Sequence, residues 1–225
     1  NCYGFANFFD RVALWPDQVT GSQLERGVAF IAQSGTISIS MMSQRRSLPL
    51  GYVISLGNQQ RLAAEDLIRY CAEDERVSAI GLYLEGILDL PKFIAAIDYA
   101  RTLGKPIALI KAGSSEKGRS AANTHTGALT GSDSLHDALF ERLGIARCET
   151  LSSLVETLKL LHCFGPLPSK RILVFGASGG DMAMVSDSAS KLDLDFSQIP
   201  ETEMEVLRAS VGERVKLNNP LDIQT

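Results

Sequence analysis

The sequence lacks the features that mark membrane-spanning and nucleic-acid-binding proteins. No apolar run reaches the roughly twenty residues that a membrane helix needs. Basic residues are not in excess, because 22 lysines and arginines are mixed with 26 aspartates and glutamates, and the net charge is −4. A chain without a basic patch favours neither nucleic acid nor an anionic membrane surface. We therefore expect no nucleic-acid partner and no membrane association.

Cysteine and histidine are also scarce. The four cysteines form no CxxC pair, and no histidine lies at metal-ligand spacing from them. This pattern predicts no metal site and is typical of reduced, buried thiols in a cytoplasmic protein. Two of the three histidines, His136 and His162, fall in helical patterns that predict packed or half-exposed rings, and we assign them no role.

What the sequence does contain is an alternation of apolar runs and helical patterns. Five predicted strands, each followed by a helix or a loop and a helix, lie at residues 27–32, 51–56, 77–86, 105–113 and 145–148. Continuous apolar strands that alternate with helices are typical of parallel sheets covered on both faces. The sequence therefore predicts an α/β fold with a flavodoxin-like, doubly wound parallel sheet.

A Gly-Pro-Leu-Pro segment at residues 165–168 predicts a domain boundary. After it, RILVFG at 171–176 predicts a new buried strand, and helices over 181–192 and 201–210 predict the start of a second flavodoxin-like domain. We therefore divide the chain into residues 1–21 (tail of a missing domain and a bridge), 22–165 (flavodoxin-like domain) and 166–225 (partial second domain). The first residue is Asn1 rather than methionine, which suggests a piece of a longer protein.

Residues 111–134 form the polar stretch KAGSSEKGRSAANTHTGALTGSDS, which predicts a long loop because it has too few apolar residues for a buried strand or helix. His125 stands at its centre, and Thr124, Thr126 and Gly127 leave room and donors for a bulky anion. One interpretation is a nucleophilic histidine that accepts a phosphoryl group. The other is a solvated histidine in a polar loop, which is the commoner case for a lone histidine.

Two strand-to-helix junctions share a Ser-Gly sequence. Such a junction exposes backbone amides at the positive end of the helix, which suits phosphate, although the same residues also make ordinary turns and caps. The predicted phosphate-binding residues are Ser34, Gly35, Thr36, Ser178, Gly179 and Gly180.

Glu85 follows the third predicted strand. It is either a carboxylate that orients an imidazole or a helix-capping or solvated acid. Because Ser34, Glu85 and His125 all follow parallel strands, we expect them at one edge of the sheet.

Eight segments resemble the NDP-forming acyl-CoA synthetase superfamily, which includes succinyl-CoA synthetase and ADP-forming acetyl-CoA synthetase. They occur in the family's order: NCYGFAN at Asn1, AFIAQSGT at Ala29, SLGN at Ser55, LYLEG at Leu82, KPIALIKAG at Lys105, GRSAANTHTGALTGSD at Gly118, FGASGGDM at Phe175 and NNPLDI at Asn218. The resemblance implies that His125 is phosphorylated, that Glu85 hydrogen-bonds it, and that both Ser-Gly helix ends bind its phosphate. Thr124 stands where the family more often has serine.

The implied reaction joins a small carboxylic acid to coenzyme A. ATP is converted to ADP and phosphate through an acyl phosphate, and His125 carries the phosphoryl group. In the family, a CoA-binding domain and an ATP-grasp domain, on the same chain or on separate subunits, hold CoA, the nucleotide and Mg²⁺ in homo- or hetero-oligomers. Here only the apparent tail of the CoA-binding domain, at residues 1–21, is present, so the resemblance implies a fragment that is inactive alone.

Other functions and details stay open. The sequence does not reveal which acid is activated or whether ATP or GTP is used. One alternative function is a non-catalytic, ligand-binding regulatory region of a protein acetyltransferase. Another is a flavodoxin-like binder of a flavin or nucleotide.

Overall fold

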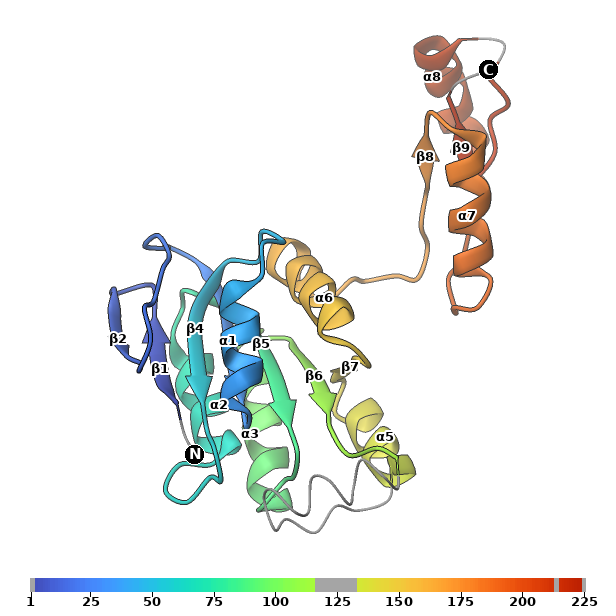
Figure 1. The fold of residues 1–225 in the computed structure, drawn as a ribbon. Helices are drawn as coiled ribbons and strands as arrows, with labels where there is room; N and C mark the ends of the chain where they lie inside the picture. The colour runs from blue at the N-terminus through green and yellow to red at the C-terminus, as the bar shows by residue number, and fades with distance from the viewer. Residues whose placement is uncertain (1–2, 116–132, 213–214, 224–225) are drawn as a thin grey trace. The chain divides into compact units, whose positions relative to one another are not determined.

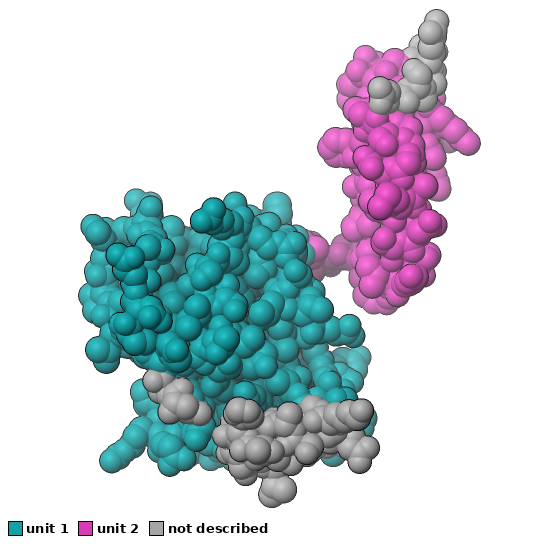
Figure 2. All heavy atoms as spheres, viewed as in Figure 1, with its two compact units in different colours: residues 1–166 teal, residues 167–225 magenta. Residues whose placement is uncertain are grey.

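The computed structural model describes residues 3–115, 133–212 and 215–223. The chain divides into two compact units, Asn1–Pro166 and Leu167–Thr225 (Figure 2). The first unit is built on a seven-stranded sheet of order β2-β1-β4-β3-β5-β6-β7. Its strands are β1 (Gly4–Asn7), β2 (Val12–Leu14), β3 (Gly27–Ala32), β4 (Leu50–Ser55), β5 (Val77–Leu84), β6 (Ile107–Lys111) and β7 (Ala146–Arg147).

Helices cover both faces of this sheet (Figure 1). One core cluster joins the sheet to α2, α3 and α5, and a second joins it to α1 and α6. These helices are α1 (Gly35–Ser43), α2 (Ala64–Glu73), α3 (Leu90–Thr102), α5 (Asp133–Arg142) and α6 (Leu151–Phe164). The strands from β3 to β7 are all parallel, and their order β4-β3-β5-β6-β7 is the 2-1-3-4-5 order of flavodoxin-like folds. The predicted fold is confirmed.

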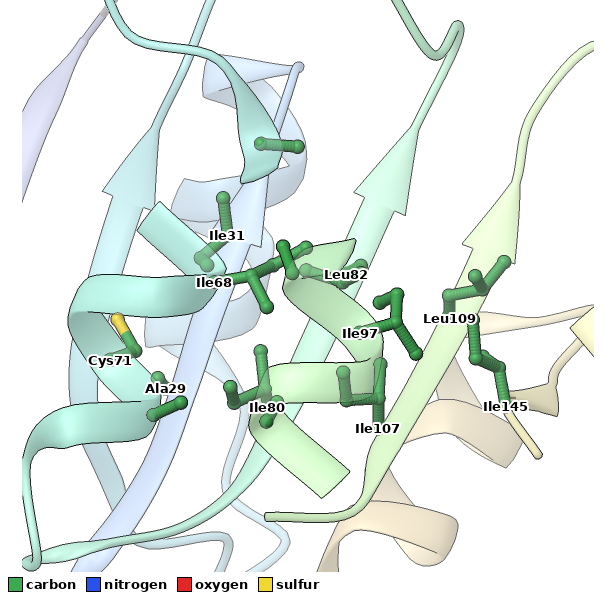
Figure 3. Packing of buried hydrophobic residues seen from close by; sticks show 14 of the residues in the cluster. Ala29, Ile31, Ile68, Cys71, Ile80, Leu82, Ile97, Ile107, Leu109 and Ile145 are labelled. Carbon is green, nitrogen blue, oxygen red and sulfur yellow. The ribbon is translucent and has the colours of Figure 1, made fainter. Parts of the chain in front are cut away.

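Strand β3 shows why the predicted strands are continuously apolar. All of its residues are buried, and successive side chains point to opposite faces of the sheet. Ala29 and Ile31 pack in the cluster with α2 and α3, whereas Phe30 packs in the cluster with α1 and α6. Figure 3 shows Ile31 beside Ile68 of α2 within the first cluster. A strand that is covered on both faces needs apolar residues at every position.

The sheet extends further toward the N-terminus than the sequence predicts. Residues 1–21 are predicted as a tail and a bridge outside the flavodoxin-like domain, but β1 pairs antiparallel with β4, and β2 pairs with β1. The aromatic ring of Phe9, in the turn between them, is buried against Tyr52 of β4. Residues 4–14 therefore belong to the first unit, because β4 would otherwise leave an unpaired edge.

The second unit contains a parallel pair of short strands, β8 (Phe175–Gly176) and β9 (Leu221–Asp222), and the helices α7 (Gly179–Ala189) and α8 (Glu201–Val211). The predicted buried strand over 171–176 is wrong in extent and burial. Only Phe175 and Gly176 are in a strand, and the side chains of Leu173 and Phe175 are 52% and 69% exposed. So few elements do not cover both faces of a strand.

Candidate functional site

The parallel strands of the first unit end at one edge of the sheet, which we call the carboxyl edge. Strand order reverses between β3 and β5, and such a switch point is where ligands bind in open α/β sheets. Ser34 follows β3 and Glu85 follows β5, and the two strand ends are joined because the N–H of Gln33 donates to the carbonyl of Tyr83 at 2.9 Å. The structure thus brings Ser34, Gly35, Thr36 and Glu85 to the same edge.

The junction after β3 is a capped helix end. The Oγ of Ser34 accepts a hydrogen bond from the N–H of Ile37 at 3.3 Å, which makes Ser34 the N-cap of α1. Gly35 allows the ring of Tyr3 to lie close to the main chain, because a Cβ added at Gly35 would lie 2.2 Å from Cδ2 of Tyr3. The cap interpretation of Ser34 is therefore confirmed. Phosphate binding by Ser34, Gly35 and Thr36 stays a prediction that the positive end of α1 supports.

Replacing Ser34 tests these two roles separately. We expect Ser34→Ala to lower the free energy of unfolding by about 1 kcal/mol and Ser34→Gly by only a few tenths, because glycine is also tolerated at an N-cap. Urea denaturation of the full-length protein measures both. If backbone amides hold the phosphate, Ser34→Gly retains phosphoryl transfer. A loss of transfer in Ser34→Gly without a loss of stability would instead assign the anion to the hydroxyl.

Side chains from neighbouring strands hold the main chain of Glu85. The Oε1 of Gln33 accepts from the N–H of Glu85 at 2.5 Å and from the N–H of Gly86 at 2.9 Å. On the other side, the Nζ of Lys111 donates to the carbonyl oxygen of Glu85 at 2.8 Å and to that of Ala112 at 2.6 Å. Gln33 and Lys111 are each only 5% exposed. Burial lowers the pKa of the Lys111 ammonium.

A third side chain reaches the same place from the loop after β4. The Nε2 of Gln59 donates to the carbonyl of Gly86 at 3.3 Å, and its Oε1 accepts from the N–H of Ala64 in the first turn of α2 at 2.8 Å. Gln59 is buried and has a φ of 55°, a conformation that costs energy for a residue with a side chain. The loop after β4 is thereby tied to the junction after β5.

One carboxylate oxygen of Glu85 receives no hydrogen bond from the described residues. The residue is half-buried, and its Oε2 atom is buried with no hydrogen-bond partner among the described residues. Burial, with the nearby negative charge of Glu85, raises the pKa of Tyr83. Buried carboxylate oxygens normally have partners, so this atom is suited to receive an N–H from a group that enters the edge.

The predicted phosphohistidine segment lies outside the described residues, including Thr124, His125, Thr126 and Gly127. The chain departs from β6 at Lys111 and re-enters the described structure at Asp133, the first residue of α5. Asp133 accepts from Nη2 of Arg147 at 2.6 Å, and Arg147 also pairs with Asp137. The departure point of the segment is therefore at the carboxyl edge, next to Glu85.

The second unit carries the other Ser-Gly junction. The Oγ of Ser178 accepts from the N–H of Asp181 at 3.3 Å and caps α7. A Cβ added at Gly179 would lie 3.1 Å from Oδ2 of Asp222, the last residue of β9. Gly180 lies in the first turn of the same helix. Phosphate binding by Ser178, Gly179 and Gly180 stays a prediction, and a carboxylate is already close to this helix end.

The sequence analysis missed Gln33, Gln59, Lys111 and Asp222. Three of them had a usable signal, because Gln33, Lys111 and Asp222 are polar residues at the carboxyl ends of predicted apolar strands or of a quoted motif. No such signal marked Gln59, because it lies in a polar loop and the turn of that loop determines its position.

A pocket of about 750 Å³ lies over β1 and β4 beside α2. Its walls are mainly apolar and include Phe5, Tyr52, Ile54, Leu62 and Tyr70. Phosphate would lose its hydration against such walls without replacement donors. The polar junctions at the carboxyl edge are therefore the better place for phosphoryl chemistry.

In the part of the chain that the structure describes, no group of three or more His, Cys, Asp or Glu side chains is placed to hold a metal ion. None of the described helices is both long and apolar enough to cross a membrane.

Known proteins resemble this chain in sequence and in fold. The family model described as "Succinyl-CoA ligase like flavodoxin domain" matches residues 25–161. The acetate–CoA ligase [ADP-forming] II subunit alpha of Pyrococcus furiosus is 34% identical over 200 residues, which are 87% of this chain and 43% of that protein. A trans-feruloyl-CoA synthase of an unknown prokaryotic organism is 30% identical over 228 residues, which are 99% of this chain and 32% of that protein.

A solved structure shows the same fold over the whole chain. It is the dinucleotide forming acetyl-coenzyme A synthetase 1 of Ca. Korarchaeum cryptofilum in complex with phosphate and ADP, with 27% identity and a TM-score of 0.88. The match covers 99% of this chain and 48% of that one. The chain therefore spans less than half the length of each of these relatives.

Proposed function

The chain belongs to the succinyl-CoA ligase like flavodoxin domain family, and we propose that it is the CoA-ligase core of an NDP-forming acyl-CoA synthetase. The relatives named as ADP-forming acid–CoA ligases support this. The observation that carries the proposal is the buried Oε2 of Glu85, which has no hydrogen-bond partner among the described residues and lies at the switch point beside the positive end of α1. A phosphorylated histidine needs both features, an acceptor for its second ring nitrogen and a positive pole for its phosphate.

In the proposed reaction, a ring nitrogen of His125 attacks the γ-phosphorus of ATP. The N–P bond forms, the bond to the ADP oxygen breaks, and ADP leaves. A carboxylate oxygen of the acid then takes the phosphoryl group, which frees the imidazole and gives an acyl phosphate. The sulfur of CoA attacks the acyl carbon, and phosphate leaves with the thiol proton. Glu85 accepts the other ring N–H, orients the imidazole and stabilises its positive charge.

The helix ends supply the remaining charge in this proposal. The amides of Gly35 and Thr36 open α1, and those of Gly179 and Gly180 open α7. Each helix end carries roughly half a positive charge, which offsets part of the desolvation of a dianionic phosphoryl group bound at its amides. Thr124, Thr126 and Gly127 give the histidine segment donors and room.

Cofactors and partners follow from the same proposal. CoA, the nucleotide and Mg²⁺ are held mainly by a CoA-binding domain and an ATP-grasp domain. The 225 residues are then inactive alone and work in a cytoplasmic homo- or hetero-oligomer with a small carboxylic acid as substrate. One relative is itself named as a subunit alpha.

Labelling the full-length protein tests this function. We expect ATP labelled on its γ-phosphate to leave a protein-bound label that is lost in acid and retained in base, as a phosphoramidate is. Addition of the acid and CoA should discharge the label. A protein that stays unlabelled with a competent nucleotide domain present would contradict the enzyme and favour the regulatory ligand-binding alternative.

A further inference from the structure

The peptide group of Glu85 is held from two sides beyond the end of its strand. β5 ends at Leu84, so the neighbouring strands give the Glu85 main chain no regular ladder partners. The side chain of Gln33, directly after β3, accepts a hydrogen bond from the N–H of Glu85. The side chain of Lys111, the last residue of β6, donates one to the carbonyl of Glu85. We call Gln33 and Lys111 the Glu85 brace.

Stability alone does not explain a lysine at this position. Lys111 as a whole is only 5% exposed, so its ammonium loses hydration, and burial lowers its pKa. An apolar side chain of similar volume would avoid that cost. The two acceptors of Lys111 are main-chain carbonyls, of Glu85 and of Ala112, so what the lysine secures is the path of the chain at the carboxyl edge.

We propose that the Glu85 brace consists of positioning residues, which aim the carboxylate of Glu85 at the imidazole of the phosphohistidine segment. This proposal rests on the proposed function of Glu85. The brace acts on the main chain, so it fixes the point from which the side chain extends, and Oε2 keeps no partner among the described residues. The same lysine also ties Glu85 to Ala112, from which the histidine segment departs. Glu85 and the start of that segment are therefore held to one another.

The chain offers a matched control at the opposite edge of the sheet. Lys105 precedes β6, and its Nζ donates to the carbonyls of Val77 at 2.6 Å and Asp74 at 3.1 Å. Burial lowers its pKa too. Lys105 thus makes the same kind of bonds as Lys111 beside the same two strands, but far from the strand ends that carry Glu85.

The test compares Lys111→Met, Lys111→Arg and Lys105→Met in the full-length protein. We measure the single-turnover rate of His125 phosphorylation at saturating ATP, and urea denaturation for stability. We expect Lys111→Met to slow phosphorylation about 100-fold, because a misplacement on the order of 1 Å costs that much. Lys111→Arg should recover most of the rate, and Lys105→Met should label at the wild-type rate.

A double substitution separates positioning from direct contact. If the brace acts through Glu85, Lys111→Met should cost less than threefold when Glu85 is already glutamine. Gln33→Met, which removes the acceptor at similar volume, should behave like Lys111→Met. Three results would contradict the positioning role of the brace. They are a wild-type labelling rate in Lys111→Met, an equal loss of rate in Lys105→Met, and the full 100-fold loss of rate in the Glu85→Gln background. A wild type that takes no label would instead overturn the proposed function, and the brace with it.

Discussion

Replacing His125 with asparagine should abolish phosphoryl incorporation into the full-length protein. Asparagine keeps a polar side chain of similar reach but has no nucleophilic nitrogen, and its amide does not form a stable bond to phosphorus. We expect a loss of at least about 1,000-fold, which is the scale for removing a covalent nucleophile. Acid-labile label per mole of protein, measured after a fixed time with γ-labelled ATP, reads out the effect.

The two other histidines provide the controls. The Nδ1 of His162 lies 2.6 Å from Oγ of Ser78, whose hydroxyl also bonds the carbonyl of Gly27, so this ring is held at the edge opposite Glu85. The ring of His136 packs near Phe140 in α5, with centroids 5.9 Å apart. Both residues are half-buried, in accord with the packed or half-exposed rings that the sequence predicts. We expect His136→Asn and His162→Asn to label as the wild type does. Equal labelling of His125→Asn would end the phosphohistidine proposal.

Most of the first unit could be predicted because its central strands and helix caps leave patterns within short stretches of sequence. Each central strand is buried on both faces, so its residues form a continuous apolar run, as at residues 27–32. The Ser-Gly junction after β3 follows in the same way, since a cap is needed wherever a strand turns into a helix. Glu85 was found by its position after a strand, and the order of strands then placed it beside Ser34.

What could not be predicted depends on pairing across the sheet. Residues 4–14 carry no long apolar run, and they form strands only because β4 offers an edge. RILVFG has the composition of a buried strand, but Phe175 stays exposed because few elements surround it in the second unit. The bonds of Gln33 and Lys111 to Glu85 join residues more than twenty positions apart, and no periodicity records such contacts.

Replacing Glu85 with glutamine should slow phosphorylation of His125 by about 100- to 10,000-fold while the sheet stays folded. The amide is isosteric with the carboxylate, but it has no charge to stabilise the developing imidazolium, and it can favour the wrong tautomer, which in a catalytic triad costs about 10,000-fold. Folding should be little affected, because Gln33 and Lys111 bond the main chain of Glu85 and not its side chain. Rapid-quench labelling gives the rate, and urea denaturation gives the stability.

Glu65 is the matched control for this substitution. It is a glutamate with 5% exposure in the first turn of α2, and burial raises its pKa. Glu65→Gln removes a different buried carboxylate from the same unit and leaves Glu85 and the two side chains that bond its main chain in place, so we expect a wild-type labelling rate. Because Oε2 of Glu85 has no partner in the described part of the chain, a carboxylate that takes no part in the chemistry would leave Glu85→Gln neutral in both assays. A slow rate at unchanged stability is therefore the result that assigns the carboxylate to chemistry, and a normal rate would remove it from the mechanism.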